Sequence, residues 1–466
     1  MPQTHENVAF LLSQTAGGRS MLHSCPIKIV NNCFYLSIGQ RFKQDFHIRR
    51  ILKMLFLLIF VALSKCHIMA QIPYIFTQLT SFVDRDYFEM LVKRYNGNAY
   101  IKSYSCWNHL ATMLWAQLTS RSSLRDIECS LRGHREKLYR MGMGTNVSRN
   151  TMANANARRD VAIFRELAQR MMERASRIPA RNAELAEIGK EFCVNGFFAG
   201  DSTTITMNLS QYPWSEPQKG KAGVKLHSLF DLMRQVPTMS LITGHEERDQ
   251  TFMDDYPIQK GCIYVFDKAY VKTKSLQRIN KLEAWYIVRI KDNMKYKVLE
   301  EKPLCDDKKV MGDKIIKFTS RWAKQNYPGA LRLVQYYSPE KNILLEFITN
   351  NMTLTPLHVA MLYKYRWDIE TWHKWVKQHL HIVSFYGTSA NAVMIQIYVA
   401  VTAFCVLALA ASAHHFEDSL FEFSRLLSTS LTEKKWLGDL ISQYQKDDYI
   451  SVLSQPKEPS LFDGLW

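Results

Sequence analysis

Residues 393–413 carry no charged side chain over 21 consecutive positions, and this run constrains the fold more than any other feature of the sequence. A stretch this long and apolar must either cross a membrane or be enclosed by other parts of the protein. It contains Gln396, Tyr398, Thr402 and Ser412 and is followed by two histidines. We favour a helix buried in a large core, although composition alone leaves a membrane span as the alternative.

The charge balance of the chain narrows the class of partner. Its 60 Lys and Arg residues outnumber its 43 Asp and Glu residues, which gives a net charge of +17. So basic a chain is expected to meet a polyanion such as nucleic acid, with an anionic membrane surface or the ribosome as alternatives. The nine cysteines form no Cys-x-x-Cys pair, which favours buried free thiols in a reducing compartment over a zinc site or a disulfide framework.

The length and the pattern of the chain predict several regions. A chain of 466 residues is long enough for two or three domains. Residues 1–68 have weak periodicity, and we interpret them as an extension upstream of a natural start at Met69. Residues 69–190 have the apolar spacing of helices, and the tail after residue 391 is again helical by pattern.

One helix in the N-terminal region carries side chains suited to contact DNA. Ser148 is a good N-cap for this helix, whose turns carry Arg149 and Arg158 together with several asparagines. Arginine and asparagine can contact phosphates or base edges bidentately. A solvated helix face is an equal alternative for the same pattern.

From residue 191 onward, short apolar runs typical of strands precede two aspartates. One run leads into Asp201, and residues 262–266 form a fully apolar run that ends directly before Asp267, as expected of a central buried strand. A single aspartate after a strand is more often a turn or cap residue, so each position is weak evidence by itself. Three further strands are predicted at residues 314–319, 331–337 and 343–349.

A long helix is predicted after these strands. Thr355 is a good N-cap, Pro356 suits the first helical position, and neither Pro nor Gly recurs until Gly387. Four side chains fall within an arc of about 60° on this helix: Tyr363, Arg366, Glu370 and Lys377. Such a stripe is suited to face a metal ion and a phosphate backbone rather than a core. The alternative is a solvated helix on which Arg366 and Glu370 form an i, i+4 ion pair.

The spacing of these four residues resembles the signature of a known family. Tyr363-x2-Arg366-x3-Glu370-x6-Lys377 is similar, position by position, to the Y-R-E-K signature of a large group of bacterial insertion-sequence DDE transposases. The resemblance covers residues 69–440 approximately. It extends to the segments that contain Cys106-Trp107-Asn108, Ser122-Ser123-Leu124-Arg125-Asp126, Asp201-Ser202-Thr203, Gly223-Val224-Lys225 and Phe385-Tyr386-Gly387.

The resemblance implies an α/β fold with an RNase H-like catalytic domain, a β-rich insertion, and helical regions on both sides. It also implies that residues 393–413 form a buried helix. The expected boundaries are a helical DNA-binding domain at 69–190, the catalytic domain at 191–385, the insertion at about 291–350, and the C-terminal helical region at 386–466.

The family chemistry implies that Asp201, Asp267 and Glu370 are catalytic and bind two Mg²⁺ or Mn²⁺ ions. Carboxylate oxygens are hard ligands that suit these ions, and two such ions would activate the attacking oxygen and stabilise the leaving oxygen. The expected reaction is cut-and-paste transposition: cleavage at the ends of the element and strand transfer into target DNA. The implied partners are double-stranded DNA and a second subunit on that DNA, in the bacterial cytoplasm at the nucleoid.

Six side chains are expected to contact DNA: Tyr363, Arg366, Lys377, Lys268, Arg149 and Arg158. In relatives, the insertion supports a hairpin intermediate, and Trp285 or Trp322 would be the stacking residue there, although a core position is the more common role of a tryptophan. Lys225 and His227 are candidates to line the site, with a structural histidine as the favoured alternative.

One position departs from the family pattern. Relatives usually follow the second aspartate with Arg and then Gly or Glu, whereas this chain has Lys268-Ala269-Tyr270. Ala269 would restrict the turn if that position requires a positive φ. The alternative function is therefore a catalytically inactive, transposase-derived DNA-binding protein, although such a protein has no need for all three carboxylates.

Overall fold

Along the chain, the strands of one sheet follow an N-terminal helical region and precede a C-terminal one. The computed structural model describes residues 72–215, 222–244, 249–303, 307–379 and 385–454. The extension predicted at residues 1–68 lies outside these described residues. The predicted α/β architecture, with helices before and after the sheet, is confirmed.

A run of helices precedes the sheet. These helices are α4 (Ile75–Thr80), α5 (Arg85–Arg94), α6 (Cys106–Leu118), α7 (Leu124–Gly133), α8 (Arg135–Leu138), α9 (Arg149–Arg158), α10 (Val161–Ala175) and α11 (Ala183–Glu191). The helix predicted after Ser148 is present as α9, and the Ser148 side chain accepts a hydrogen bond from the backbone N–H of Thr151. Arg149 and Arg158 are the first and last residues of this helix and are both exposed.

The described strands form one nine-stranded mixed sheet with the order β3-β2-β1-β4-β5-β9-β8-β7-β6. Strands β1, β4 and β5 pair in parallel, and the other neighbours pair antiparallel. The strands are β1 (Gly196–Met207), β2 (Ala222–Asp231), β3 (Val236–Gly244), β4 (Cys262–Phe266), β5 (Trp285–Arg289), β6 (Tyr296–Glu301), β7 (Val310–Phe318), β8 (Leu331–Ser338) and β9 (Ile343–Thr349). The connections contain η2 (Asp249–Asp254), η3 (Lys268–Tyr270), α12 (Thr273–Lys281) and α13 (Arg321–Asn326).

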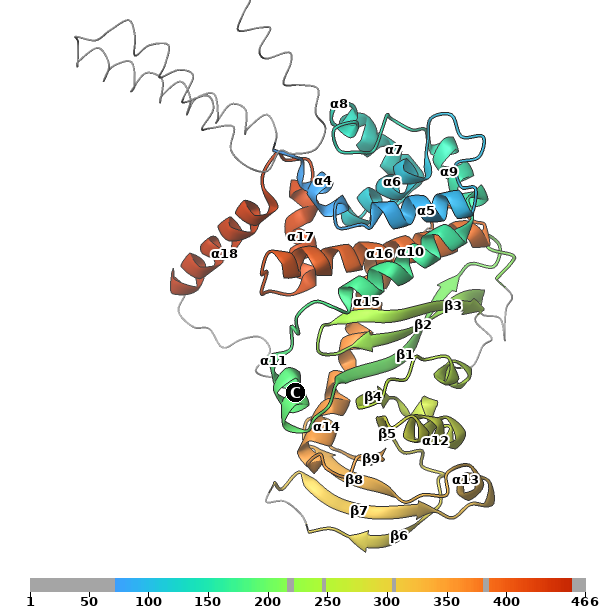
Figure 1. The fold of residues 1–466 in the computed structure, drawn as a ribbon, viewed down its shortest axis with the longest axis vertical. Helices are drawn as coiled ribbons and strands as arrows, with labels where there is room; N and C mark the ends of the chain where they lie inside the picture. Colours follow the sequence, from blue (N-terminus) through green and yellow to red (C-terminus); the bar gives the residue numbers. More distant parts are fainter. Residues whose placement is uncertain (1–71, 216–221, 245–248, 304–306, 380–384, 455–466) are drawn as a thin grey trace, which may run out of the picture. The chain divides into compact units, whose positions relative to one another are not determined.

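Strand β4 lies inside the sheet, between β1 and β5, and all five of its residues are buried. Alternate side chains of a strand point to opposite faces. Ile263 and Val265 belong to one core cluster together with side chains of α10 and of two later helices, α14 (Pro356–Tyr365) and α15 (Trp367–His379). Tyr264 and Phe266 belong to a second cluster under α12 and α13. The sheet is therefore covered on both faces, with α14 on one side and α12 on the other (Figure 1).

The second half of the sheet contains the three strands predicted near residues 314–349. They are present as β7, β8 and β9, and β9 pairs antiparallel with β5, so these strands continue the same sheet. The edge strand β6 was not predicted. Its residues are partly or fully exposed, so the apolar periodicity on which a strand prediction depends is weak there.

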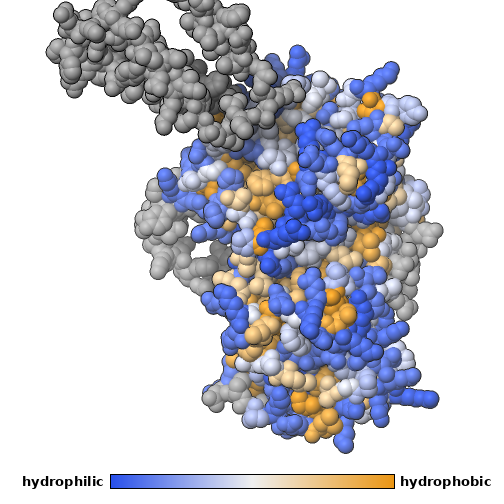
Figure 2. Space-filling view, viewed as in Figure 1, coloured by the Kyte–Doolittle hydropathy of each residue, from blue (hydrophilic) through white to orange (hydrophobic). Residues whose placement is uncertain are grey.

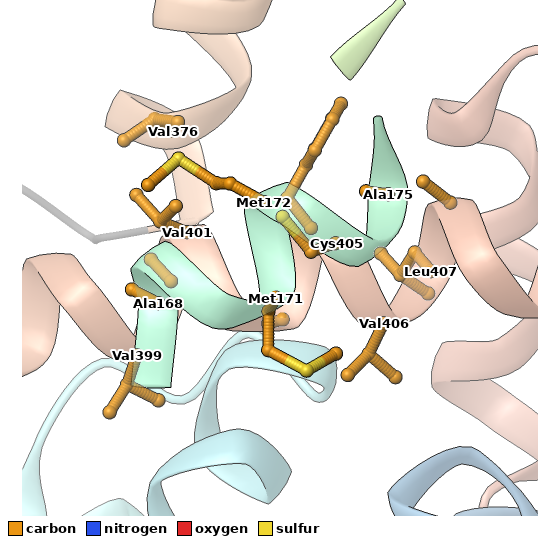
Figure 3. Packing of buried hydrophobic residues seen from close by; sticks show 14 of the residues in the cluster. Ala168, Met171, Met172, Ala175, Val376, Val399, Val401, Cys405, Val406 and Leu407 are labelled. Atoms are coloured by element: carbon orange, nitrogen blue, oxygen red, sulfur yellow. The ribbon is translucent and has the colours of Figure 1, made fainter. Parts of the chain in front are cut away.

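The uncharged run is a buried helix, α16 (Ala390–Ala413). By length and composition it could cross a membrane, yet 89% of its most apolar 18-residue window is buried inside the protein. Figure 3 shows Val401 and Cys405 of α16 close to Met172 of α10. The helices before the sheet and α16 after it thus share one core cluster.

The last described helices close this core. They are α17 (Leu420–Ser430) and α18 (Leu437–Ser454). Tyr74 forms an isolated antiparallel bridge with Lys434, and the backbone N–H of Ile75 donates to the carbonyl of Glu433 at 3.0 Å. The first described helix is therefore tied to the C-terminal helices.

The prediction of one continuous helix from Pro356 towards Gly387 is wrong. Thr355 caps the helix and Pro356 starts it as predicted, but α14 ends at Tyr365 and α15 begins at Trp367. At the junction, the N–H of Arg366 donates to the carbonyl of Tyr363, a bond three residues apart rather than four. Sequence periodicity missed this break because neither a proline nor a glycine marks it.

A buried ion pair joins two strands of the outer half of the sheet. Arg332 on β8 donates to both carboxylate oxygens of Asp313 on β7, each at 2.7 Å, and the two side chains are only 3% and 5% exposed. Arg332 also donates to the carbonyl of Leu354 just before α14. Removal of one partner would leave the other charge buried and unpaired.

We expect Arg332→Ala to lower the free energy of unfolding by about 3–5 kcal/mol, because Asp313 would lose its partner in a buried environment. Urea denaturation followed by circular dichroism measures this loss. The matched control is Arg85→Ala, which breaks the exposed Arg85–Glu89 pair and should cost less than about 1 kcal/mol. Equal losses for the two variants would contradict the structural role of the buried pair.

Candidate active site

Asp201 and Asp267 lie beside each other because β1 and β4 pair in parallel. The register places Gly200 beside Phe266, so the next residue on each chain segment is one of the two aspartates. Gly200 is needed there, because a Cβ at this position would lie 2.4 Å from a ring carbon of Phe266. Asp267 directly follows β4 as predicted. Asp201 lies within β1, which continues to Met207, so the prediction that it follows its strand is wrong.

Helices α14 and α15 bring further polar side chains to the same place. The Tyr363 hydroxyl donates to Asp267 Oδ1 at 3.1 Å. Arg366 Nη1 lies 2.9 Å from Glu370 Oε1. Asp201 interacts electrostatically with Arg366, Glu370 and Asp267. The three predicted catalytic carboxylates therefore belong to one cluster, with Arg366 as its cation.

The cluster changes the acidity of Asp201. Burial raises the pKa of Asp201 to about 6, and the neighbouring carboxylates Glu370 and Asp267 act in the same direction. The backbone N–H of Ser202 and the guanidinium of Arg366 oppose this rise in pKa. Asp201 is thus a buried carboxyl group that keeps its proton to a higher pH than an exposed aspartate does.

Arg366 and Tyr363 are more buried than a phosphate-facing stripe would be. Burial acts to lower the pKa of Arg366, but Tyr363, Glu370 and Asp201 outweigh it, so the pKa is raised. Burial likewise raises the pKa of Tyr363 to about 12. The expectation that this stripe cannot face the protein interior is therefore wrong for its first two members, whereas the i, i+4 pair of Arg366 and Glu370 is present.

One residue of the site was missed by the sequence interpretation. His373 Nδ1 lies 3.8 Å from Asp201 Oδ2, and His373 Nε2 lies 3.3 Å from Ser228 Oγ. Burial, with Lys377 and His227 nearby, lowers the pKa of His373 to about 3, so its contact with Asp201 is that of a neutral imidazole rather than an ion pair. The signal available in the sequence was the offset of three residues from Glu370, which places both side chains on one face of α15.

The three carboxylates are suitable ligands for a hard divalent cation, but in this conformation they are not arranged around a common metal position. Asp201, Asp267 and Glu370 offer only carboxylate oxygens, the ligands preferred by Mg²⁺ and Mn²⁺. Within the part of the chain that the structure describes, no group of three or more His, Cys, Asp or Glu side chains is arranged to hold a metal ion. Glu370 is instead bound by Arg366.

The other predicted DNA-contacting residues lie in two places. Lys377 on α15 is half-buried, and its charge interacts with Asp201, so it borders the carboxylate cluster. Lys268 is exposed in η3, directly after Asp267. Arg149 and Arg158 lie on α9, which packs with α7 and α16 in the helical region. For these four residues, as for Tyr363 and Arg366, contact with DNA stays a prediction.

Alanine at position 269, where relatives have Gly or Glu, does not strain the backbone. Ala269 lies in the short η3 turn and is not among the described residues with positive φ. Of the two candidate stacking residues, Trp322 is exposed, whereas Trp285 packs against the core. His227 is buried, bonded to Thr243 and stacked on Phe252, which is a structural environment.

Two family models match the chain. Residues 195–406 match a transposase DDE domain, and this range contains the carboxylate cluster described above. The chain carries a transposase DDE domain and is a DNA transposase. Residues 73–144 of this transposase match a domain of unknown function.

Bacterial proteins named as transposases are similar to this DNA transposase. A transposase from Sinorhizobium fredii is 29% identical over 61% of this chain and 77% of its own length. An insertion-sequence transposase from Synechocystis is 26% identical over 64% and 83% of the two chains, and one from Geobacillus stearothermophilus is 26% identical over 44% and 54%. Among solved structures, the piggyBac transposase synaptic complex with hairpin DNA matches with a TM-score of 0.42 and 11% identity, over 84% of this chain and 87% of that one.

The raised pKa of Asp201 predicts a pH-dependent effect of Asp201→Asn in metal-free protein. Between pH 3.8 and about 6 the folded protein holds a proton that the unfolded chain has lost, so this group makes the protein less stable as the pH rises through that window. Asp201→Asn should therefore stabilise the protein by roughly 2 kcal/mol at pH 8 and by much less at pH 4.5.

Urea denaturation in EDTA at the two pH values measures this difference. Asp254→Asn is the control of opposite sign: burial acts to raise the pKa of Asp254, but Lys272 and Ser275 outweigh it and the pKa is lowered. Its replacement should make the protein less stable at pH 8. A stabilisation by Asp201→Asn that is the same at both pH values would contradict the raised pKa.

Proposed function

We propose that this transposase cleaves DNA at the ends of an insertion sequence and joins those ends to target DNA, with Asp201, Asp267 and Glu370 as the catalytic carboxylates. The observation that carries this proposal is the adjacency of Asp201 and Asp267 on the paired strands β1 and β4, with Glu370 of α15 near enough to raise the pKa of Asp201. They come from segments far apart in the sequence, and clustering like charges is costly unless the site binds a cation.

We propose an RNase H-like arrangement for residues 191–385. The strand order β3-β2-β1-β4-β5, with the first three strands antiparallel and the last three parallel, supports it. In this organisation residues 69–190 form the DNA-binding domain, residues 291–350 the β-rich insertion, and residues 386–466 the C-terminal helical region. The chain would then belong to the Y-R-E-K group, through Tyr363, Arg366, Glu370 and Lys377.

Two Mg²⁺ or Mn²⁺ ions would be held by Asp201, Asp267 and Glu370. When bound, they supply activation of the attacking oxygen and stabilisation of the leaving oxygen in an in-line displacement. Arg366 then has to release Glu370, and its guanidinium becomes available to a phosphate oxygen. Tyr363 keeps Asp267 oriented through its hydroxyl, and the neutral His373 borders Asp201 without adding a charge that would compete with a cation.

The proposed DNA contacts fall into two groups. Lys268, Lys377, Tyr363 and Arg366 would hold the phosphates next to the scissile bond, and Arg149 and Arg158 would contact the duplex further away. Because two ends must be joined, we propose a dimer on DNA in the bacterial cytoplasm, at the nucleoid. The net charge of +17 supports a polyanionic partner.

Glu370→Gln should abolish cleavage of a labelled duplex that carries the DNA flanking this gene, with a loss of at least about 100-fold in the presence of Mg²⁺, because an amide cannot replace the anionic ligand. Denaturing gel electrophoresis of the 5′-labelled strand measures it. The matched control is Glu340→Gln, which removes an exposed carboxylate in the turn between β8 and β9 and should cleave as the wild type does.

The alternative function, a catalytically inactive DNA-binding protein, makes a different prediction. It requires that the wild type binds the same duplex but leaves it intact at every Mg²⁺ or Mn²⁺ concentration. Cleavage that survives Glu370→Gln would overturn the assignment of the carboxylates rather than the binding of DNA.

A further inference from the structure

Two loops flank the N-terminal end of α6, in the part of the chain that matches a domain of unknown function. The first comprises residues 95–105 and the second residues 139–148. Both contact the same side chain: Asn108 Nδ2 lies 3.4 Å from the carbonyl of Ser103, and a Cβ on Gly144 would lie 2.5 Å from that same nitrogen. The two loops, called here the α6 loop pair, therefore meet at Asn108.

The second loop is anchored by two buried methionines and by a hydrogen bond from α6. Met141 and Met143 are buried, and the glycines that follow them, Gly142 and Gly144, have φ values of +76° and +78°. This left-handed backbone suits glycine and lets the two methionines point inward from a tight turn. The indole Nε1 of Trp107 donates to the carbonyl of Gly142 at 3.1 Å.

The first loop is anchored at both of its sides. The backbone N–H of Cys106 donates to Asn98 Oδ1 at 2.7 Å. The buried Arg159, which follows α9, donates to the carbonyl of Tyr104. Asn391 at the start of α16 in turn donates to the carbonyl of Arg159 at 2.7 Å. The first loop is thus fixed to α16 by a chain of hydrogen bonds.

These anchored loops present aromatic and basic side chains to solvent. Tyr100 is fully exposed and Tyr139 is 82% exposed, and both rank among the most exposed large side chains of the described residues. Lys102 and Arg140 are exposed beside them in sequence. Tyr100 has a φ of +58°, a conformation that a bulky residue adopts only when its surroundings impose it. An exposed tyrosine held in this way contributes nothing to the core.

The charge around the loop pair favours an anionic partner. Residues 96–149 contain eight Lys and Arg against three Asp and Glu, a net charge of +5 in 54 residues, whereas the whole chain carries +17 in 466. Hydrophilic side chains predominate over the α7–α9 end of the molecule on the face drawn in Figure 2. This segment is therefore more basic than the average of an already basic chain.

We propose that the α6 loop pair binds the phosphate backbone of double-stranded DNA. Lys102 and Arg140 neutralise phosphates, and the hydroxyls of Tyr100 and Tyr139 donate to phosphate oxygens. The surface continues through residue 148 into α9, whose first residue is Arg149. The identity of the duplex rests on the proposed function, but the binding itself does not require catalysis.

Fluorescence anisotropy of the full chain with a labelled duplex in EDTA tests this surface, since no cleavage can occur under these conditions. Lys102→Ala/Arg140→Ala should weaken binding about tenfold or more at 0.1 M salt and reduce the slope of log K against log salt by about 1–2. Tyr100→Phe/Tyr139→Phe should weaken binding by a smaller factor. Circular dichroism should show unchanged folding, because these side chains are exposed.

The matched control is Lys190→Ala/Lys281→Ala, which removes the same charge from exposed positions on α11 and α12. It should bind the duplex nearly as the wild type does. Wild-type binding by the loop variant, or an equal loss in the control, overturns the proposal. A wild-type protein that binds the duplex but never cleaves it would overturn the proposed function. The effect of the loop variant on binding could still be measured in that case.

Discussion

The parallel pairing of β1 with β4 is the constraint on which the site depends. Parallel neighbours carry their residues in the same direction, so the register of Gly200 with Phe266 necessarily brings Asp201 and Asp267 together. The absence of a side chain at Gly200 allows the Phe266 ring to fill the space at this crossing. A shift by one residue would turn one of the two aspartates towards the opposite face of the sheet.

The carboxylates of the cluster have one buried cation and one neutral imidazole beside them, both supplied by the α14–α15 segment. Arg366 is buried, and its charge is retained because Glu370 and Asp201 are close to it. His373 of the same helix as Glu370 also borders Asp201, and burial keeps it neutral. Burial is the main cause of the raised pKa of Asp201, Glu370 and Asp267 add to it, and a bound cation would offset both effects.

The helical region connects this chemistry to the rest of the chain. Helix α16 shares a core cluster with α6 and α10 and also packs against α15, which carries Glu370. Trp375 of α15 contacts Phe404 of α16 with ring centroids 4.9 Å apart. The helices before the sheet are therefore not separated from the carboxylate cluster by a free linker, and a DNA duplex held on the α6 loop pair would be held by the same core that positions Glu370.

The sequence by itself determined the local elements and the residues that carry the chemistry. Apolar runs marked β4 and α16, a polar cap and a proline marked the start of α14, and the spacing of acidic and basic residues singled out Glu370. Tertiary structure alone decided the break at Arg366, the contact of Tyr363 with Asp267, and the place of His373 beside Asp201. Sequence periodicity shows only which face of a helix or strand is apolar. The contacts named here depend on how separate elements pack. A buried charge, in particular, is tolerated only when another residue supplies its partner.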